Sequence, residues 1–245
     1  MPNFLRFTSI LLLVLLGDAG CREFREAGHL EASPMEKAPR NTSETQTPHK
    51  RQAPELKSLP DTAFVRLSDY SPDFSYDLRY ATEDNFMKEA VYDCPKCYTR
   101  VKTARALIAA NREFMEKGTR IRFFDCYRPN SVQFKMWEIV PNPQYVANPM
   151  RGSVHNRGGA VDITLETLTG TPLDMGTDFD YFGKRAYHDN GDLPENVLEN
   201  RRLLKETMEK YGFQSVRTEW WHYNLKAATA DPVADFRWPC FEDSQ

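Results

Sequence analysis

The sequence predicts a single folded domain of the α+β class, in which helices flank a central, largely antiparallel sheet. Two kinds of segment favour this class: short runs rich in aromatic and β-branched residues, and longer stretches with apolar residues at helical spacing. The two kinds do not alternate regularly, and neither an internal repeat nor a dinucleotide-binding fingerprint occurs. With 245 residues, 40% of them hydrophobic, the chain is long enough to form a packed core.

Four segments have the composition of strands. They are FSYDLRYA (74–81), RIRFFDCY (120–127), AVDITL (160–165) and FQSVRTEWWHYN (213–224). Three helices are expected, over 103–117, 129–141 and 195–211. Gly118 and Gly212 follow the first and last of these as C-terminal stops, and Pro129 suits the first turn of the middle one.

Residues 1–20 are predicted to form a secretory signal peptide. Arg6 supplies the positive charge, and the apolar run SILLLVLLG that follows is too short to span a bilayer. Cys21 follows Asp18-Ala19-Gly20, which favours a lipoprotein cleavage site, although Asp18 stands where such sites usually carry Leu. Two outcomes stay open: acylation of Cys21, which would tether the protein to a membrane, and plain signal cleavage. Either outcome predicts an exported protein of the periplasm or cell envelope.

Residues 21–60 are rich in charged residues, Pro, Ser and Thr and nearly empty of large apolar side chains. This composition predicts a disordered tether, so the folded domain is expected over 61–245. The net charge of −3 gives no reason to expect a nucleic-acid partner. The oligomeric state stays open.

In an exported protein, the four remaining cysteines form an even set that is expected to be disulfide-bonded. They are Cys94, Cys97, Cys126 and Cys240. Three pairings are possible, and the sequence does not choose among them. Cys94 and Cys97 could instead form half of a four-cysteine zinc site, but no second C-x-x-C motif is present.

Two histidines and one aspartate predict a catalytic metal site. His155 and Asp162 flank the pair Gly158-Gly159, which would let the chain turn from a loop into a strand. With His222 they offer two imidazoles and a carboxylate, a set that leaves one position of a tetrahedral zinc ion open for water. Taken alone, the His-x6-Asp pair is a weak signal, because His155 could be an ordinary polar residue and Asp162 a strand-edge carboxylate. One zinc ion per chain is expected.

The segment TEWWHYN (218–224) carries the candidate general base. Glu219 and His222 would point to opposite faces of a regular strand, so a bulge or turn is expected to bring both into one cleft. Glu219 could then take the proton from the attacking water. The alternative is an aromatic core strand with an incidental Glu and His. Arg128 follows a predicted strand and could stabilise an oxyanion, or could be a surface arginine paired with a carboxylate.

Five segments, taken in order, resemble the zinc D-alanyl-D-alanine dipeptidases of the VanX type. They are YDLRYATEDNF (76–86), FDCYRP (124–129), SVHNRGGAVDITL (153–165), MGTDFDYFGKRAYH (175–188) and EWWHYN (219–224). The resemblance covers most of residues 63–240, and the combination of S-x-H-x6-D, E-x-W-H and a Y-R-P arginine is specific. It implies a hedgehog- and D,D-peptidase-like fold and zinc-dependent hydrolysis of a small D,D-dipeptide.

The resemblance also implies a role for each matching residue. His155, Asp162 and His222 would bind the zinc ion. Glu219 would act as the general base, and Arg128 would stabilise the tetrahedral intermediate.

Three further matches imply how the substrate is held. Ser153 would help to bind the carboxylate of the dipeptide, while Asp180 and Tyr80 would meet its free amino group. Asp174 or Asp178 could replace Asp180 in a slightly different alignment. Tyr80 could also be a half-buried core aromatic.

Two departures from the family bear on the function. The stretch 139–152 is brief, and a shorter covering loop could relax specificity. Export would place the enzyme outside the cytosol, where it would digest dipeptide for cell-wall recycling or nutrition. Two alternatives remain: a D,D-carboxypeptidase acting on peptidoglycan stem peptides, and a non-catalytic zinc-containing binding module like the hedgehog domains. The second is less consistent with the presence of both Glu219 and Arg128.

Overall fold

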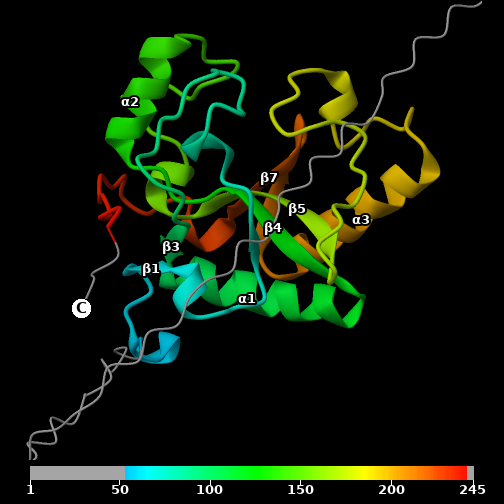
Figure 1. Ribbon diagram of the computed structural model, residues 1–245, viewed down its shortest axis with the longest axis horizontal. Helices are drawn as coiled ribbons and strands as arrows, with labels where there is room; N and C mark the ends of the chain where they lie inside the picture. Colours follow the sequence, from blue (N-terminus) through cyan, green and yellow to red (C-terminus); the bar gives the residue numbers. More distant parts are fainter. Residues whose placement is uncertain (1–52, 242–245) are drawn as a thin grey trace, which may run out of the picture. The chain divides into compact units, whose positions relative to one another are not determined.

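The computed structural model describes residues 53–241 (Figure 1). The predicted signal peptide, Cys21 and most of the predicted tether lie outside the described residues. Residues Leu56–Ser58 form a short 3-10 helix, η1, and the carbonyl of Leu56 accepts a 2.6 Å hydrogen bond from Arg105. Among the described residues, no helix combines the length and apolar character that a membrane span requires.

A five-stranded sheet forms the centre of the fold, in the order β2-β4-β5-β7-β6. Its strands are β2 (Ser75–Tyr76), β4 (Thr119–Asp125), β5 (Ala160–Thr167), β6 (Phe213–Val216) and β7 (Glu219–Leu225). Only β2 pairs in parallel, and the other three pairings are antiparallel. A smaller antiparallel sheet joins β1 (Phe64–Arg66) to β3 (Tyr98–Arg100). The predicted α+β class with a largely antiparallel sheet is therefore confirmed.

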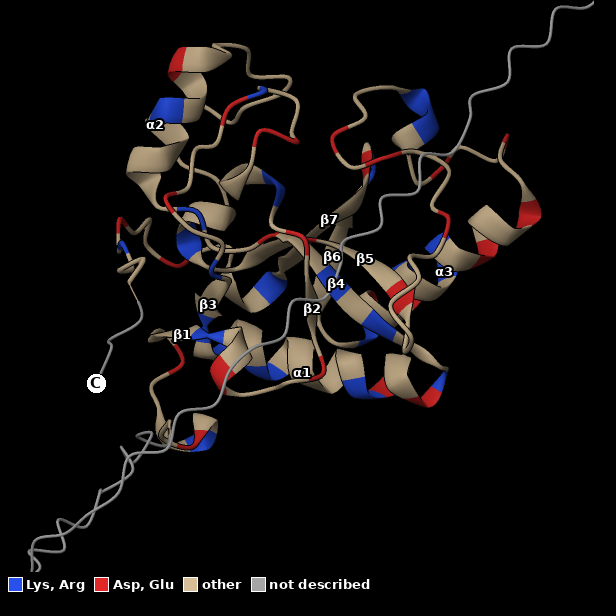
Figure 2. Cartoon of the chain, in the orientation of Figure 1, with Lys and Arg blue, Asp and Glu red and all other residues tan. Residues whose placement is uncertain are grey.

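The two faces of the central sheet differ because successive side chains on a strand alternate. On β5, Val161, Ile163 and Leu165 are fully buried in the apolar core with helices α1 (Val101–Glu116) and α3 (Glu195–Lys210). The alternate residues of β5 are polar: Asp162, Thr164 and Glu166. On this polar face Arg120 and Arg122 of β4 form ion pairs with the buried Glu166, and Figure 2 shows basic residues along β4. The polar face carries the candidate site.

The three predicted helices are confirmed, with the middle one forming α2 (Asn130–Ile139) directly after Pro129. Gly118 and Gly212 adopt left-handed φ angles of 77° and 88°, the conformation that commonly ends a helix. Of the strand predicted over 74–81, only β2 forms. The chain then turns into the 3-10 helix η3 (Arg79–Ala81), since the side chain of Arg79 binds Asp77 and the carbonyl of Tyr80 accepts two amide hydrogen bonds.

All four candidate cysteines form disulfides, which confirms that prediction and resolves the pairing. Cys94 bonds to Cys240, and Cys97 bonds to Cys126. Because Cys94 and Cys97 have different partners, they do not form half of a four-cysteine zinc site.

Candidate metal centre and active site

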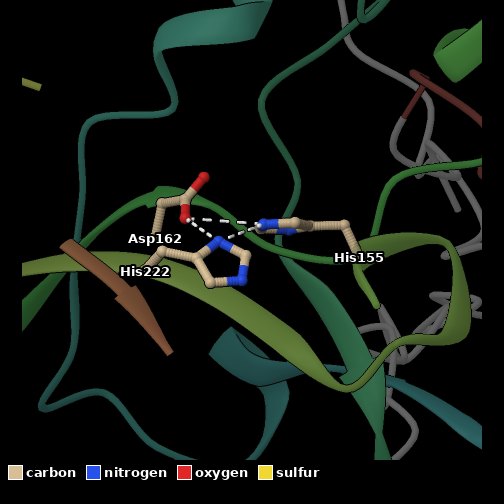
Figure 3. Close-up of side chains that lie close together, drawn as sticks. All are labelled: His155, Asp162 and His222. Atoms are coloured by element: carbon tan, nitrogen blue, oxygen red, sulfur yellow. Dashed lines mark hydrogen bonds and ion pairs between the residues drawn. The ribbon is translucent and has the colours of Figure 1, made fainter. Parts of the chain in front are cut away.

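Three elements bring the predicted metal ligands together (Figure 3). His155 begins the 3-10 helix η4 (His155–Arg157), while Asp162 and His222 lie directly opposite each other on β5 and β7. Gly158 turns the chain with a left-handed φ of 69°, and a Cβ there would lie 2.6 Å from Phe64. A Cβ on Gly159 would lie 2.5 Å from that of Ala228. Glycine is thus required at 158 by the left-handed backbone, and at both positions because a Cβ would collide with a neighbouring side chain.

The donor atoms of the three residues are spaced as the ligands of one tetrahedral metal ion would be. His155 Nε2 lies 3.2 Å from His222 Nδ1 and 3.4 Å from Asp162 Oδ1, and His222 Nδ1 lies 2.9 Å from Asp162 Oδ1. Ligands about 2.0–2.1 Å from a tetrahedral centre are roughly 3.3 Å apart. The three side chains can therefore hold a small divalent cation and leave a fourth position open.

Hydrogen bonds to the outer ring nitrogens orient both imidazoles. His155 Nδ1 donates to the carbonyl of Cys126 at 2.7 Å, and His222 Nε2 donates to Asn224 Oδ1 at 2.9 Å. Each bond holds the proton on the outer nitrogen and leaves the inner nitrogen free to bind a metal. Asn224 was not identified from the sequence, although its position two residues after His222 on a strand places it on the same face.

The electrostatics of the cluster suit a cation. Burial disfavours the ionised form of Asp162, but the two neighbouring imidazoles outweigh it and hold the pKa of Asp162 below its ordinary value. Burial also opposes the charged form of His222, yet the hydrogen bond and charge of Asp162 raise the pKa of His222 to about 9. A metal ion held here would take the place of that positive charge, because its imidazole and carboxylate ligands bind in their deprotonated forms.

The predicted bulge brings Glu219 to the metal ligands. Val216 of β6 lies opposite Glu219 of β7, but Ser215 lies opposite Tyr223, so residues 220–222 have no counterpart on β6. Glu219 Oε2 lies 3.9 Å from His222 Nδ1. Burial first, and the charge of Asp162 in addition, raise the pKa of Glu219. The carboxylate is thus adjacent to the candidate metal ion without being one of its three ligands.

Arg128 is buried, with 6% of its surface exposed, which excludes the alternative of a surface arginine. Its guanidinium donates to Asp125 Oδ2 from Nη2 at 2.6 Å and to Gln133 Oε1 from Nη1 at 2.9 Å. It also lies over the ring of Tyr80, 5.1 Å from the centroid. Three contacts therefore fix the orientation of the charge.

Asp125 connects Arg128 to the metal ligands, a role that sequence reasoning missed. Its Oδ1 accepts a 2.7 Å hydrogen bond from the Tyr92 hydroxyl, and its Oδ2 lies 3.5 Å from His155 Nδ1. The residue stands in the FDCYRP segment, so its proximity to Arg128 could have been noticed. Its contacts with Tyr92 and His155 depend on the tertiary fold.

Two of the candidate substrate-binding residues, Tyr80 and Asp180, lie near the same centre. The Tyr80 hydroxyl donates to Asp180 Oδ2 at 2.9 Å, and Asp180 adopts an unusual left-handed φ of 58°. Burial, followed by the charge of Asp162, raises the pKa of Asp180. Asp174 and Asp178 have other partners: Asp174 accepts from the amide of Gly176, and Asp178 pairs with Arg79.

Ser153 precedes His155 by two residues, and its hydroxyl donates to Asn156 Oδ1 at 3.1 Å. Aromatic side chains lie close by: Phe179 stacks on Phe124 with ring centroids 4.8 Å apart and meets Trp221 edge-on. Phe124, Phe179 and Trp220 also border a hollow of about 350 Å³ that none of the three metal-ligand candidates lines.

Comparison with known proteins identifies related sequences. The family Peptidase_M15, described as D-ala-D-ala dipeptidase, matches residues 60–243. The D-alanyl-D-alanine dipeptidase of Escherichia coli K12 is 34% identical over 180 residues, which cover 74% of this chain and 93% of that protein. Its namesake from Enterococcus faecalis is 32% identical over 67% of this chain and 92% of its own. Among solved structures, the LdcB LD-carboxypeptidase aligns with a TM-score of 0.41 and 18% identity, over 71% of this chain and 73% of its own.

Proposed function

Because the chain belongs to the Peptidase_M15 family of D-Ala-D-Ala dipeptidases, we propose that it hydrolyses D-alanyl-D-alanine with a zinc ion held by His155, Asp162 and His222. The chain is a peptidase of this family, and its relatives' names give the substrate. The observation that carries the proposal is the tetrahedral spacing of three donor atoms beside Glu219.

The donor set suits zinc in particular. Two imidazole nitrogens and one carboxylate oxygen with a fourth position open are typical of catalytic zinc sites, whereas structural sites use four protein ligands. When bound, zinc supplies a Lewis acid that makes water a nucleophile at neutral pH. The orienting bonds to Cys126 and Asn224 complete a centre of this kind.

The side chains around the centre divide the remaining work. Glu219 takes the proton from the attacking water at its carboxylate and returns it to the nitrogen of the leaving D-alanine. The buried guanidinium of Arg128 stabilises the negative charge that develops on the substrate carbonyl oxygen. Asp125 and Gln133 hold that guanidinium in place, so no reorientation accompanies the reaction.

Different side chains recognise the two ends of the dipeptide. Asp180, held by Tyr80, receives the ammonium group. The hydroxyl of Ser153 turns from Asn156 Oδ1 to donate to the carboxylate. A longer or acylated peptide would leave the carboxylate of Asp180 buried without its cationic partner, which costs free energy.

Blocking the amino group tests this recognition. We expect the kcat/KM of N-acetyl-D-Ala-D-Ala to be about 10⁴-fold lower than that of free D-Ala-D-Ala. This is the ratio typical of a site whose buried polar group loses its partner on the substrate. Asp180→Asn should reduce this preference by impairing cleavage of the free dipeptide, while Asp192→Asn, on an exposed loop, should not. Equal or faster cleavage of the acylated substrate by the wild type would favour the D,D-carboxypeptidase alternative.

We also propose that the enzyme is exported and acts in the periplasm or cell envelope, with acylation of Cys21 as a membrane tether. Residues 1–21 carry this proposal, and the two disulfides support it because such bonds persist in oxidising compartments. Cell fractionation tests it. Mature protein in the cytosol with residues 1–20 intact would contradict it.

A further inference from the structure

Three links join the segment 92–98 to the chain that leaves β4. They are the Cys97–Cys126 disulfide, a 2.7 Å hydrogen bond from the Tyr92 hydroxyl to Asp125 Oδ1, and a 2.9 Å hydrogen bond from the Tyr127 amide to the Tyr98 carbonyl. The disulfide lies inside the fold, since Cys97 and Cys126 are 3% and 2% exposed. The covalent link is therefore part of a buried junction.

This junction contacts the candidate metal centre through His155. The carbonyl of Cys126 accepts the 2.7 Å hydrogen bond that orients His155, and the amide of Arg128 donates to the carbonyl of His155 at 3.1 Å. β4 ends at Asp125, so Cys126 lies beyond the regular ladder with β5. The position of the orienting carbonyl thus depends on contacts other than sheet pairing.

We infer that the Cys97–Cys126 disulfide is a positioning element of the metal centre: it fixes the Cys126 carbonyl that orients the ligand His155. The inference rests on the proposed function, because it requires that His155 bind the metal. The imidazole must present Nε2 to the ion in one orientation, and the loss of such an outer partner typically weakens metal binding about 10- to 100-fold.

The chain contains a matched control in its second disulfide. Cys94 and Cys240 are both half-buried, and the hydrogen bonds that orient His155 and His222 come from other residues. The Cys94–Cys240 bond spans 146 residues, whereas the Cys97–Cys126 bond spans 29. Because a longer closed loop restricts the unfolded chain more, a purely entropic role predicts the larger loss of stability when Cys94–Cys240 is removed. A positioning role predicts that only Cys97–Cys126 affects the metal.

The experiment compares two double variants of the full chain, Cys97→Ala/Cys126→Ala and Cys94→Ala/Cys240→Ala. Alanine at 126 keeps the backbone carbonyl, so the first variant removes the covalent link and two buried sulfur atoms but not the hydrogen-bond acceptor of His155. Zinc affinity is measured by competition with a chelating dye, well below the lower melting temperature, together with the absorption spectrum of the cobalt-substituted proteins. We expect zinc affinity to fall about 10- to 100-fold in the first variant, with an altered cobalt spectrum, and to stay unchanged in the second.

Equal zinc affinity and equal cobalt spectra in the wild type and both variants would overturn the inference while leaving the proposed function intact. Failure of the wild type to bind zinc would overturn the proposed function itself. If the Cys97→Ala/Cys126→Ala variant does not fold, the remaining disulfide is reduced with a phosphine in folded Cys94→Ala/Cys240→Ala protein. Loss of zinc affinity with an unchanged far-ultraviolet spectrum then supports the inference, and retained affinity at full reduction overturns it.

Discussion

Glu219→Ala is expected to retain the metal and to lower the kcat for D-Ala-D-Ala by about 100- to 10,000-fold, the range that a positioned general base contributes. The three metal donors keep their spacing in this variant, because Glu219 Oε2 is a neighbour of His222 Nδ1 at 3.9 Å and not part of the set. What is lost is the group that takes the proton from water. The effect should therefore fall on turnover and not on metal content.

Steady-state kinetics and metal analysis of the same samples measure both quantities. Glu219→Gln serves as the second variant, because the amide keeps the shape of the side chain but does not act as a base at neutral pH. Glu199→Ala, on the exposed side of α3, is the matched control and should behave as the wild type. Full activity of zinc-loaded Glu219→Ala would remove the proposed base from the mechanism.

His222→Ala is expected to lose both the metal and the activity. His222 supplies one of the three donor atoms. Its Nδ1 also lies 2.9 Å from Oδ1 of Asp162, its cross-strand partner. The fall in zinc affinity should exceed the roughly 10- to 100-fold that the loss of an outer-shell partner costs. At a zinc concentration that just saturates the wild type, the turnover of His222→Ala should fall together with its bound zinc.

His188→Ala provides the comparison with a histidine outside the cluster. His188 is half-buried near Tyr223, and burial lowers its pKa to about 4, so it is neutral at pH 7. This variant should retain zinc and turnover. Equal zinc affinity in His222→Ala and His188→Ala, measured by dye competition, would show that His222 is not a ligand.

Local signals predicted the helices and most strands of this fold. The ends of two helices could be predicted from Gly118 and Gly212, because glycine readily adopts the left-handed conformation found there. The start of the middle helix could be predicted from the fixed φ of Pro129. The strand expected over 74–81 was wrong beyond Tyr76. Arg79 binds Asp77 locally, and the Tyr80 carbonyl accepts hydrogen bonds from the amides of residues 91 and 92, a pairing that the strand-like composition does not reveal.

In the candidate site, too, some features could be predicted from the local sequence and others could not. The bulge at Glu219 could be predicted, since an i, i+3 pair in an aromatic strand shares one face only if the strand is irregular. Asn224 was missed although its partner, His222, is only two residues away on the same strand. Asp125 was missed because its partners are defined by tertiary contacts, such as the bond from Tyr92, 33 residues away. The disulfide pairing was open for that reason too: the docking of Cys97 beside Cys126 depends on how β3 meets the end of β4.

The central claim is that hydrolysis of D-Ala-D-Ala depends on a zinc ion held by His155, Asp162 and His222. The most direct test is D-alanine release from the free dipeptide by the purified full chain, with zinc content determined before chelation, after chelation and after zinc is returned. We expect release and bound zinc to disappear together and to recover together. Undiminished release by zinc-free protein would contradict the claim, as would the absence of release from a folded, zinc-loaded chain.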